Sequence, residues 1–477
     1  MATATTSEAD VQVPLKLLVN KCTNKVIFAE ANKDFVDILF SFLMLPLGTI
    51  ARLVEKDSNI EPLTIGCLHS LYHSVQNLDN QCFCTQECKQ MLEQPRNIPE
   101  DYCNTLKLNI DDPQSKEYFI CSKSDPGKHL LSPFKTELNC SCGSPLTRVF
   151  FKHSFSGFVH DNATFVITDD LVVIPNSVSK LNLAVLQNSG IKDPSEVQEM
   201  TVNVTKEKIL DLLKCSLISK SCLTYLLSEK KPILDRSTFS LCSVEYDKNI
   251  EISLNLVIRK SDGKLLYAQG DNHFADMILS FLTFPLGGVI RILGGNCSLG
   301  CIDKLYKSIV DLEENIYWMS EVVKKRLIDP SLVSSVLLTN HIFPFFHPNH
   351  YKFCTDYVDF SSGDGTVNMS CVKNDGRYYS VTPTVWYLQM FLYGFGYVKG
   401  PQTYLVTDDL VVAPFSTTSV LNLINCSKTP LSDLKEKNVV IGFKECINIL
   451  KASLTSTSAL TNGLDHFFTD DKGRIDT

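Results

Sequence analysis

The hydrophobic and polar positions of this chain follow the same pattern twice. In each half, two runs of alternating apolar and polar residues surround a short polar turn, which contains Asn24 in the first copy and Asp262-Gly263 in the second. Alternation with a period of two predicts a β-strand, and a short polar turn between two such runs predicts a β-hairpin. Each half of the chain is therefore predicted to begin with a β-hairpin.

A mostly apolar stretch follows each predicted hairpin. Residues 34–54 and 273–293 are identical at 9 of 21 positions. The most apolar part of the first copy, residues 38–50, is shorter than the roughly 20 apolar residues that a bilayer-spanning helix needs. We therefore predict a buried core helix that ends at Pro46, rather than a transmembrane segment or a short anchor at a membrane surface.

This apolar helix is predicted to cover the hairpin of its own copy. Phe35 and Phe42 lie two turns apart on one helical face, which should pack against the apolar side of the hairpin. Ser41 tolerates burial because its hydroxyl can donate to a carbonyl one turn earlier. Truncation of Phe42 or of its counterpart Phe281 is therefore expected to destabilise mainly the half of the chain that contains it.

Further blocks recur in the same order in both halves. They are an amphipathic helix, a strand that ends in Thr-Asp-Asp, and a closing helix. The block with Thr-Asp-Asp is identical at 7 of 11 positions. The paired blocks are residues 66–75 and 300–309, residues 165–175 and 404–414, and residues 213–224 and 450–461.

The recurring blocks predict a tandem duplication of a unit of roughly 200 residues, which is the size of a domain. Strands and helices do not alternate strictly along each unit, which favours the α+β class over a Rossmann-like parallel sheet. Each α+β unit is predicted to contain a β-hairpin, an apolar helix, an amphipathic helix, a strand and closing helices. The predicted repeat lobes are residues 12–230 and 251–465.

Several of these features carry a resemblance to a known family. The hairpin with its apolar stretch, the recurring Thr-Asp-Asp block, the Cys-x-Cys-Gly motif at Cys140 and the duplication resemble a plant family catalogued as domain of unknown function 674. The similarity extends over roughly residues 10 to 465. The resemblance implies a plant protein and supplies no activity, cofactor or catalytic residue. The second copy departs from the motif, because Met369 stands at the position of Cys140 and Val372 at that of Gly143.

Composition and charge narrow the possible functions. The 477 residues are 44% hydrophobic and 21% charged, which is typical of a folded globular protein and argues against wholesale disorder. A net charge of -8 argues against broad electrostatic binding of nucleic acid or anionic membranes. The chain also lacks a GxSxG, a Walker A and a GxGxxG motif, so the common nucleophile and nucleotide-phosphate sites are not indicated.

The cysteines predict a reducing compartment. There are 18, a lower density than in small proteins that disulfides hold together. The first ten residues, MATATTSEAD, have no apolar core of a secretory signal. We therefore predict a cytoplasmic protein whose cysteines are mostly thiols.

Three cysteines of the first copy indicate a metal site. Cys121, Cys140 and Cys142 supply three soft ligands, and the glycine after Cys142 suits a tight turn around a metal. A structural zinc site needs a fourth ligand, for which Cys103 and His153 are candidates. The alternative is that all three are buried thiols in the core. Because Met369 replaces Cys140 in the second copy, at most one structural zinc ion per chain is expected.

Two other clusters of cysteines and histidines are weaker candidates for a metal site than these three cysteines. Cys82, Cys84 and Cys88 lie in a helix-like run in which only Cys84 and Cys88 share a face. A second group of potential ligands is interrupted by prolines and phenylalanines, which favour an irregular loop with core anchors over a metal site. This group contains His341, His347, His350 and Cys354.

The paired carboxylates Asp169-Asp170 and Asp408-Asp409 permit two interpretations. Acids at the end of a strand can serve metal binding or acid–base catalysis. Adjacent residues on a strand point to opposite faces, however, so each pair cannot act as one catalytic dyad without a bend. We favour turn and capping roles, because no nucleophile or base motif accompanies either pair.

Three functions remain open from the sequence. The first is a non-enzymatic binding or scaffold protein with a protein or small-molecule ligand between its two lobes, since pockets favour such interfaces. The second is an enzyme with a site between the lobes that uses Asp169 or Asp408. The third is an interaction module that zinc stabilises. The residues that recur are mostly apolar or turn-forming, which favours the first.

Overall fold

The fold follows from a computed structural model of the chain. It describes the following residues: 11–56, 58–96, 103, 106–111, 117–121, 128–132, 140, 142–152, 157–176, 191, 193–228, 250–319, 321–328, 342–343, 352–355, 366–368, 370–371, 384–388 and 396–469.

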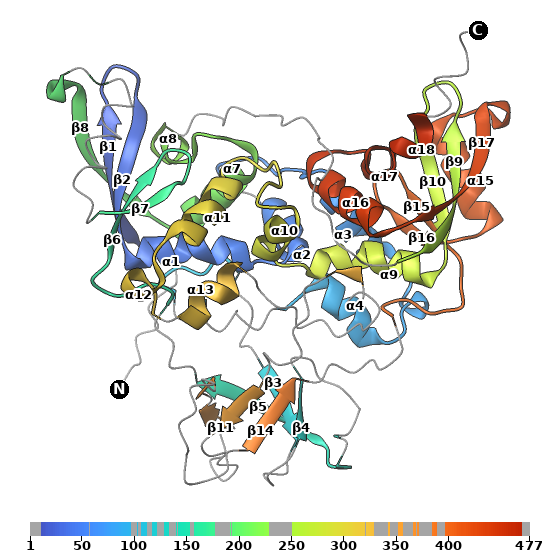
Figure 1. The fold of residues 1–477 in the computed structure, drawn as a ribbon, viewed down its shortest axis with the longest axis horizontal. Helices are drawn as coiled ribbons and strands as arrows, with labels where there is room; N and C mark the ends of the chain where they lie inside the picture. Colours follow the sequence, from blue (N-terminus) through green and yellow to red (C-terminus); the bar gives the residue numbers. More distant parts are fainter. Residues whose placement is uncertain are drawn as a thin grey trace, which may run out of the picture.

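Two antiparallel sheets of five strands lie at opposite ends of the molecule (Figure 1). Their strand orders correspond, β7-β6-β2-β1-β8 in the first and β16-β15-β10-β9-β17 in the second. This arrangement confirms the α+β class and fits the duplication. The strands of the first sheet are β1 Val13–Asn20, β2 Lys25–Asn32, β6 Thr164–Thr168, β7 Val173–Pro175 and β8 Val197–Val204, and those of the second are β9 Ile252–Arg259, β10 Leu265–Gly270, β15 Tyr404–Thr407, β16 Val412–Pro414 and β17 Leu434–Ile441.

The predicted hairpins form the centre of these two sheets. β1 pairs with β2, and β9 pairs with β10. The turns need a positive φ, which is 55° at Asn24 and 71° at Gly263. Asn and Gly are the residues that adopt this conformation most readily, which explains the polar turns in the sequence.

Most helices lie in the space between the two sheets, whereas one helix of the second copy, α15, packs on the outer side of the second sheet (Figure 1). The first copy contributes α1 Lys33–Ser41, α2 Leu47–Val54, α3 Leu68–Asn77, α4 Gln86–Glu93, α7 Lys206–Ile218 and α8 Cys222–Ser228. The second contributes α9 Asn272–Ser280, α10 Leu286–Ile292, α11 Ile302–Asp311, α12 Glu314–Tyr317, α13 Glu321–Ile328, α15 Thr417–Ser427, α16 Phe443–Thr455, α17 Ala459–Gly463 and α18 His466–Thr469. Short 3-10 turns are η2 Phe42–Met44, η3 Asn80–Cys82, η4 Pro194–Glu196, η5 Phe281–Thr283 and η6 Leu431–Asp433.

The apolar stretch is buried, but it does not form the single helix that the sequence predicted. α1 ends at Ser41, η2 follows, and Pro46 is the residue before α2. Proline suits the start of a helix because it has no N–H to leave unsatisfied and its φ is already helical. The predicted hydrogen bond of the serine hydroxyl is present, because Ser41 Oγ donates to the carbonyl of Ile38 at 2.6 Å. In the second copy, Ser280 Oγ donates to the carbonyl of Met277 in the same way. Among the helices that the structure describes, none is long and apolar enough to cross a bilayer.

The two copies exchange their amphipathic helices. α3 of the first copy lies against β16 of the second sheet, and α11 of the second copy lies against β7 of the first sheet (Figure 1). The exchange has the same polar contact on both sides. Ser74 Oγ accepts from the N–H of Val412, and Ser308 Oγ accepts from the N–H of Val173, each at 3.0 Å.

The chains of the two copies cross next to the prolines of the apolar stretches. Leu47 N–H donates to the carbonyl of Phe284 at 2.9 Å, and Leu286 N–H donates to that of Leu45 at 3.0 Å. A Cβ at Gly48 would lie 3.0 Å from the carbonyl oxygen of Leu282, so glycine permits the close approach. One continuous hydrophobic core therefore includes residues of both copies.

A third sheet, below the helices in Figure 1, contains strands from both copies. Its order is β12-β5-β3-β4-β14-β11-β13. The copies join through parallel pairs, β14 with β4 and β12 with β5. The strands are β3 Glu117–Cys121, β4 Lys128–Ser132, β5 Leu146–Lys152, β11 Lys352–Thr355, β12 Thr366–Asn368, β13 Ser370–Cys371 and β14 Thr384–Leu388.

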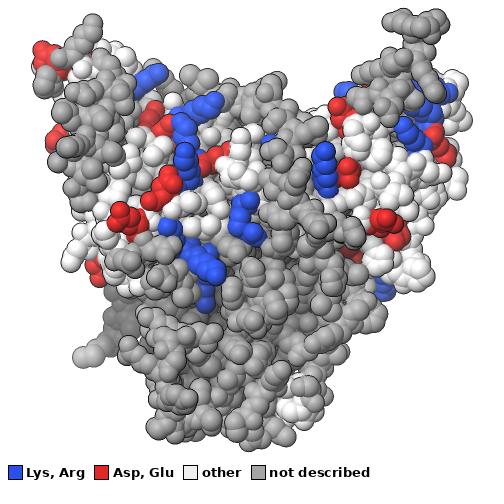
Figure 2. Space-filling view, viewed as in Figure 1, with Lys and Arg blue, Asp and Glu red and all other residues white. Residues whose placement is uncertain are grey.

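Charged side chains of the described residues are mixed in sign on the face shown in Figure 2. Lys and Arg lie among Asp and Glu there rather than in one broad basic area. The expectation that the chain binds no nucleic acid stays a prediction.

We expect the two halves to stay together after cleavage between them. The predicted junction after residue 230 lies outside the described residues, and the lobe boundaries 12–230 and 251–465 stay a prediction. An engineered protease site in this junction should yield two fragments that elute together from a size-exclusion column, because α3 and α11 each pack on the other copy. Fragments that separate without denaturant would contradict the exchange.

Candidate functional site

The first carboxylate of each Thr-Asp-Asp block caps a helix. Asp169 accepts from the backbone N–H and the hydroxyl of Thr224 in α8, at 2.7 and 2.8 Å. Asp408 accepts from the N–H of Thr461 in α17 at 2.7 Å. Asp is a preferred residue where N–H groups at a helix start lack partners. Both carboxylates thus hold a closing helix against the end of a strand.

The second carboxylate stabilises the turn itself. Thr168 Oγ1 donates to Asp170 at 2.5 Å, and Thr407 Oγ1 donates to Asp409 at the same distance. The residue after each pair has a positive φ, so the chain reverses direction sharply there. These contacts favour the turn and capping interpretation of both carboxylate pairs.

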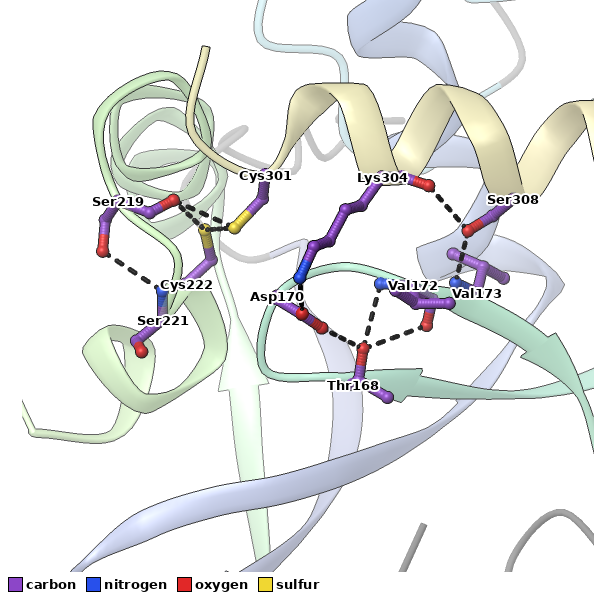
Figure 3. Close-up of polar contacts among 10 residues, drawn as sticks. All are labelled: Thr168, Asp170, Val172, Val173, Ser219, Ser221, Cys222, Cys301, Lys304 and Ser308. Carbon is purple, nitrogen blue, oxygen red and sulfur yellow. Dashed lines mark hydrogen bonds and ion pairs between the residues drawn. The ribbon is translucent and has the colours of Figure 1, made fainter. Parts of the chain in front are cut away.

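Asp170 also contacts the exchanged helix α11. Lys304 forms an ion pair with this carboxylate, and Ser308 lies one turn further along α11 against Val173 (Figure 3). Although burial raises the pKa of Asp170, the hydrogen bonds from Lys304 and Thr168 hold it below its usual value. The block therefore joins the two copies.

The start of α11 is held by thiols. Cys301 Sγ donates to the carbonyl of Ser219 at 2.9 Å and lies 3.2 Å from Cys222 Sγ (Figure 3). On the other side of the molecule, Cys67 Sγ donates to the carbonyl of Ser456 at 3.0 Å. Burial raises the pKa of Cys222 well above its usual value, so this thiol stays protonated at neutral pH. These cysteines serve packing.

The three cysteines that were predicted to be metal ligands lie close together in the structure. Their sulfur atoms all lie within 4.8 Å of one another, and those of Cys121 and Cys142 are 3.4 Å apart. Cys121 ends β3, Cys140 is buried beside it, and Cys142 is exposed. Three sulfur atoms at this spacing can share one ion, because Zn–S bonds are about 2.3 Å long.

A tight turn aims these sulfur atoms. Gly143 N–H donates to the carbonyl of Cys140 at 2.8 Å, and Cys140 N–H donates to that of Ser144 at 2.9 Å. Gly143 has a φ of 82°, which glycine adopts without strain. Hydrogen bonds from the backbone and side chain of Ser144 lower the pKa of Cys142 to about 6. Cys142 is therefore largely a thiolate at neutral pH, the form that binds metals.

Neither candidate for the fourth ligand is found in this group of described residues. Cys103 is buried but lies outside the cluster. His153 lies outside the described residues, as do His341, His347 and His350 and the side chain of Cys354. The set of Cys121, Cys140 and Cys142 therefore fits zinc as three of its four usual ligands.

The other cysteine cluster differs from its prediction. Thr85 caps α4, so Cys84 precedes the helix and Cys88 lies inside it. Cys84 Sγ donates to the carbonyl of Val398 at 3.1 Å, a contact with the second copy. Thr85 accepts from the N–H of Cys88 and so starts a new helix, which the helix-like spacing of the cysteines concealed.

Comparison with protein families shows to which family the sequence of this chain belongs. A family model described as "Protein of unknown function (DUF674)" matches residues 9–442 and 397–472. The chain belongs to the DUF674 family. No curated protein and no solved structure matches it.

Sequence reasoning missed a buried carboxylate in each copy of this DUF674 protein. Asp37 Oδ1 accepts from the N–H groups of Phe158 and Val159 at 2.9 and 3.1 Å. In the same way, Asp276 Oδ1 accepts from the N–H groups of Tyr397 and Val398. Burial raises the pKa of both carboxyls to about 7. The recurrence of an aspartate inside an otherwise apolar stretch was the feature of the sequence that could have indicated these buried carboxylates.

A second group of potential metal ligands was also missed. Glu55, His69 and His73 place ligand atoms within 4.8 Å of one another at the junction of α2 and α3. The two histidines are four residues apart on a predicted helix, which puts them on one face. This spacing was visible in the sequence, but the carboxylate that completes the group was not.

Proposed function

We propose that this DUF674 protein is a non-enzymatic binding or scaffold protein, with a protein or small-molecule ligand between its two copies. The proposal rests on the structural role of the polar residues that recur in both copies. Asp37, Asp169 and Ser74, like their counterparts Asp276, Asp408 and Ser308, all hydrogen bond to backbone N–H groups. Duplication has thus retained groups that hold the fold together.

The alternative, an enzyme that uses Asp169 or Asp408, gains no support from these contacts. A catalytic carboxylate needs an oxygen within hydrogen-bond reach of a substrate proton. Both oxygens of Asp169 already accept from Thr224.

The cysteine cluster adds a stabilising element to the proposal. A zinc ion bound by Cys121, Cys140 and Cys142 would fix the end of β3 in the sheet that both copies share. Structural zinc sites contribute directly to folding free energy. A cytoplasmic location, where thiols stay reduced, is part of this proposal.

Elemental analysis and native mass spectrometry of protein purified without chelator test both parts. We expect zinc at the cysteine cluster and its loss in Cys142→Ser, since this thiol is exposed and its pKa is lowered to about 6. Cys426→Ser is the matched control, because Cys426 is also exposed and lies outside the cluster. Zinc content unaffected by Cys142→Ser would exclude the site.

The same spectra address the scaffold interpretation. A small molecule that co-purifies in stoichiometric amount would support binding between the copies. A molecule that the protein converts into a different mass on incubation would favour the enzyme and overturn the proposal.

A further inference from the structure

Glu55, His69 and His73 bring three ligand atoms to one point. Glu55 Oε1 lies 2.7 Å from His69 Nδ1 and 2.6 Å from His73 Nε2. The Nε2 atoms of the two imidazoles are 3.0 Å apart. Ligands of one ion at about 2.0–2.2 Å from it lie roughly 3 Å apart, so only a small outward adjustment would admit an ion.

Hydrogen bonding accounts for only part of this arrangement, because the bond between the two Nε2 atoms does not include Glu55. Glu55 Oε1 and His69 Nδ1 are both buried as atoms, yet neither has a hydrogen bond of acceptable geometry. Their short separation brings them within ion-pair distance, but directed N–H···O bonding is missing. Buried polar atoms in a folded protein normally have a partner, and a cation is one that a carboxylate oxygen and imidazole nitrogens can share.

The orientation of His73 is fixed from its far side. His73 Nδ1 lies 2.8 Å from the side-chain oxygen of Gln76, one turn along α3. A proton on Nδ1 bonded to this oxygen leaves Nε2 with a free electron pair toward Glu55. Imidazoles that bind metals are usually held in this way by a second hydrogen bond.

The helix that carries both histidines is itself fixed by the second copy. Cys67 N–H, just before α3, donates to the carbonyl of Ser453 in α16 at 2.8 Å. A Cβ at Gly66 would lie 2.2 Å from the same oxygen, so the approach is as close as glycine permits. The exchange of helices therefore places the histidines rigidly against the end of α2.

The geometry points to a divalent transition-metal site formed by Glu55, His69 and His73. Two imidazoles and one carboxylate suit Zn²⁺ or Fe²⁺, whereas Mg²⁺ and Ca²⁺ prefer oxygen ligands alone. The side chains are 25%, 30% and 44% exposed for Glu55, His69 and His73, so solvent reaches the site. Three protein ligands leave coordination positions open to water or to a bound ligand.

The site is present in one copy. At the corresponding positions of the second copy stand Gly294, Asp303 and Lys307. Asp303 instead accepts from the N–H groups of Cys297 and Ser298. The metal is therefore additional to the one zinc expected at the cysteines, and its ligands are independent of that cluster.

Cobalt titration of protein first stripped with chelator tests the inference. Co²⁺ bound by thiolates absorbs strongly in the near ultraviolet, whereas Co²⁺ bound by imidazole and carboxylate shows only weak visible bands. We expect one ion without thiolate absorption, lost in His73→Ala and in Glu55→Gln and retained in Cys142→Ser. Gln76→Ala should weaken its affinity about 10-fold to 100-fold, the usual effect of removing such a hydrogen bond.

Lys307→Ala is the matched control, because Lys307 is exposed at the position of His73 in α11 and should leave cobalt binding unchanged. Circular dichroism confirms that each variant is folded. Weak visible bands that persist in both His73→Ala and Glu55→Gln, or that never appear, would overturn the inference and leave an ion-paired cluster of imidazoles and carboxylate. Loss of thiolate absorption alone in Cys142→Ser would affect only the cysteine site.

Discussion

Replacing Phe42 or Phe281 by alanine is expected to lower the free energy of unfolding of the whole molecule by about 3 to 5 kcal/mol, the usual cost of truncating a core aromatic. Both side chains are completely buried. η2, which contains Phe42, lies against α10 of the second copy, and η5, which contains Phe281, lies against α2 of the first. Each phenylalanine thus stabilises both copies, so the expectation of an effect on mainly one half is revised.

Denaturant unfolding followed by two probes measures this effect. Trp318 stacks on Phe40 of the other copy at 5.4 Å between ring centres, so its fluorescence, measured with the other tryptophan replaced by Trp386→Phe, reports contact between the copies. Far-ultraviolet circular dichroism reports the whole fold. We expect both probes to shift together in each variant.

Leu431→Ala is the control, since this side chain is 70% exposed and should change the free energy of unfolding by less than about 0.5 kcal/mol. Two transitions of which Phe42→Ala moves only one would show that the copies unfold separately, against the shared core.

The local elements could be predicted because their signals are local. Alternating residues gave the hairpins, and Asn24 and Gly263 marked turns that need a positive φ. The edge strands β8 and β17 were missed, because their partners β1 and β9 lie far away in sequence. Pairing over such distances leaves no periodic trace in a single strand.

The exchange of helices could not be predicted for a different reason. A duplicated chain offers each amphipathic helix two similar docking surfaces, one in its own copy and one in the other. Ser74 and Ser308 would suit either surface, since each needs only a backbone N–H at the end of a Thr-Asp-Asp turn. The choice depends on how the connecting segments run in space, which the hydrophobic pattern does not encode.

The candidate sites were predictable to the extent that their ligands are neighbours in sequence. Cys140 and Cys142 stand in one motif, and the turn through Gly143 aims them as expected. Glu55 meets His69 and His73 only because α2 and α3 pack together. One carboxylate at the end of a helix has no feature in the sequence that separates it from a surface acid.

Stability is expected to fall as the pH rises from about 4 to about 7, in part because of Asp37 and Asp276. Burial raises the pKa of each carboxyl from 3.8 to about 7, so the folded state holds a proton that the unfolded state has released. The stabilisation from each group is complete below the unfolded pKa and is lost as the pH rises through the folded one. A difference of about three pKa units corresponds to roughly 4 kcal/mol.

Asp37→Asn and Asp276→Asn isolate this contribution. An asparagine side chain keeps the oxygen that accepts from the two backbone N–H groups but carries no charge at any pH. Each variant should match the parent in unfolding free energy near pH 4 and exceed it by a few kcal/mol near pH 8, because the parent alone must bury a charge there. Urea unfolding at half-unit steps between pH 4 and pH 8 measures the difference.

Asp34→Asn is the matched control on the same helix, because its carboxylate pairs with Lys107 at the surface at 2.6 Å. It should not gain stability at high pH. Asp37→Ala should destabilise the protein at every pH, since the N–H groups of Phe158 and Val159 lose their acceptor. A parent and an asparagine variant whose difference in unfolding free energy stays constant from pH 4 to pH 8 would mean that these carboxyls remain charged in the fold. The two N–H groups would then stabilise each carboxylate more than burial opposes it.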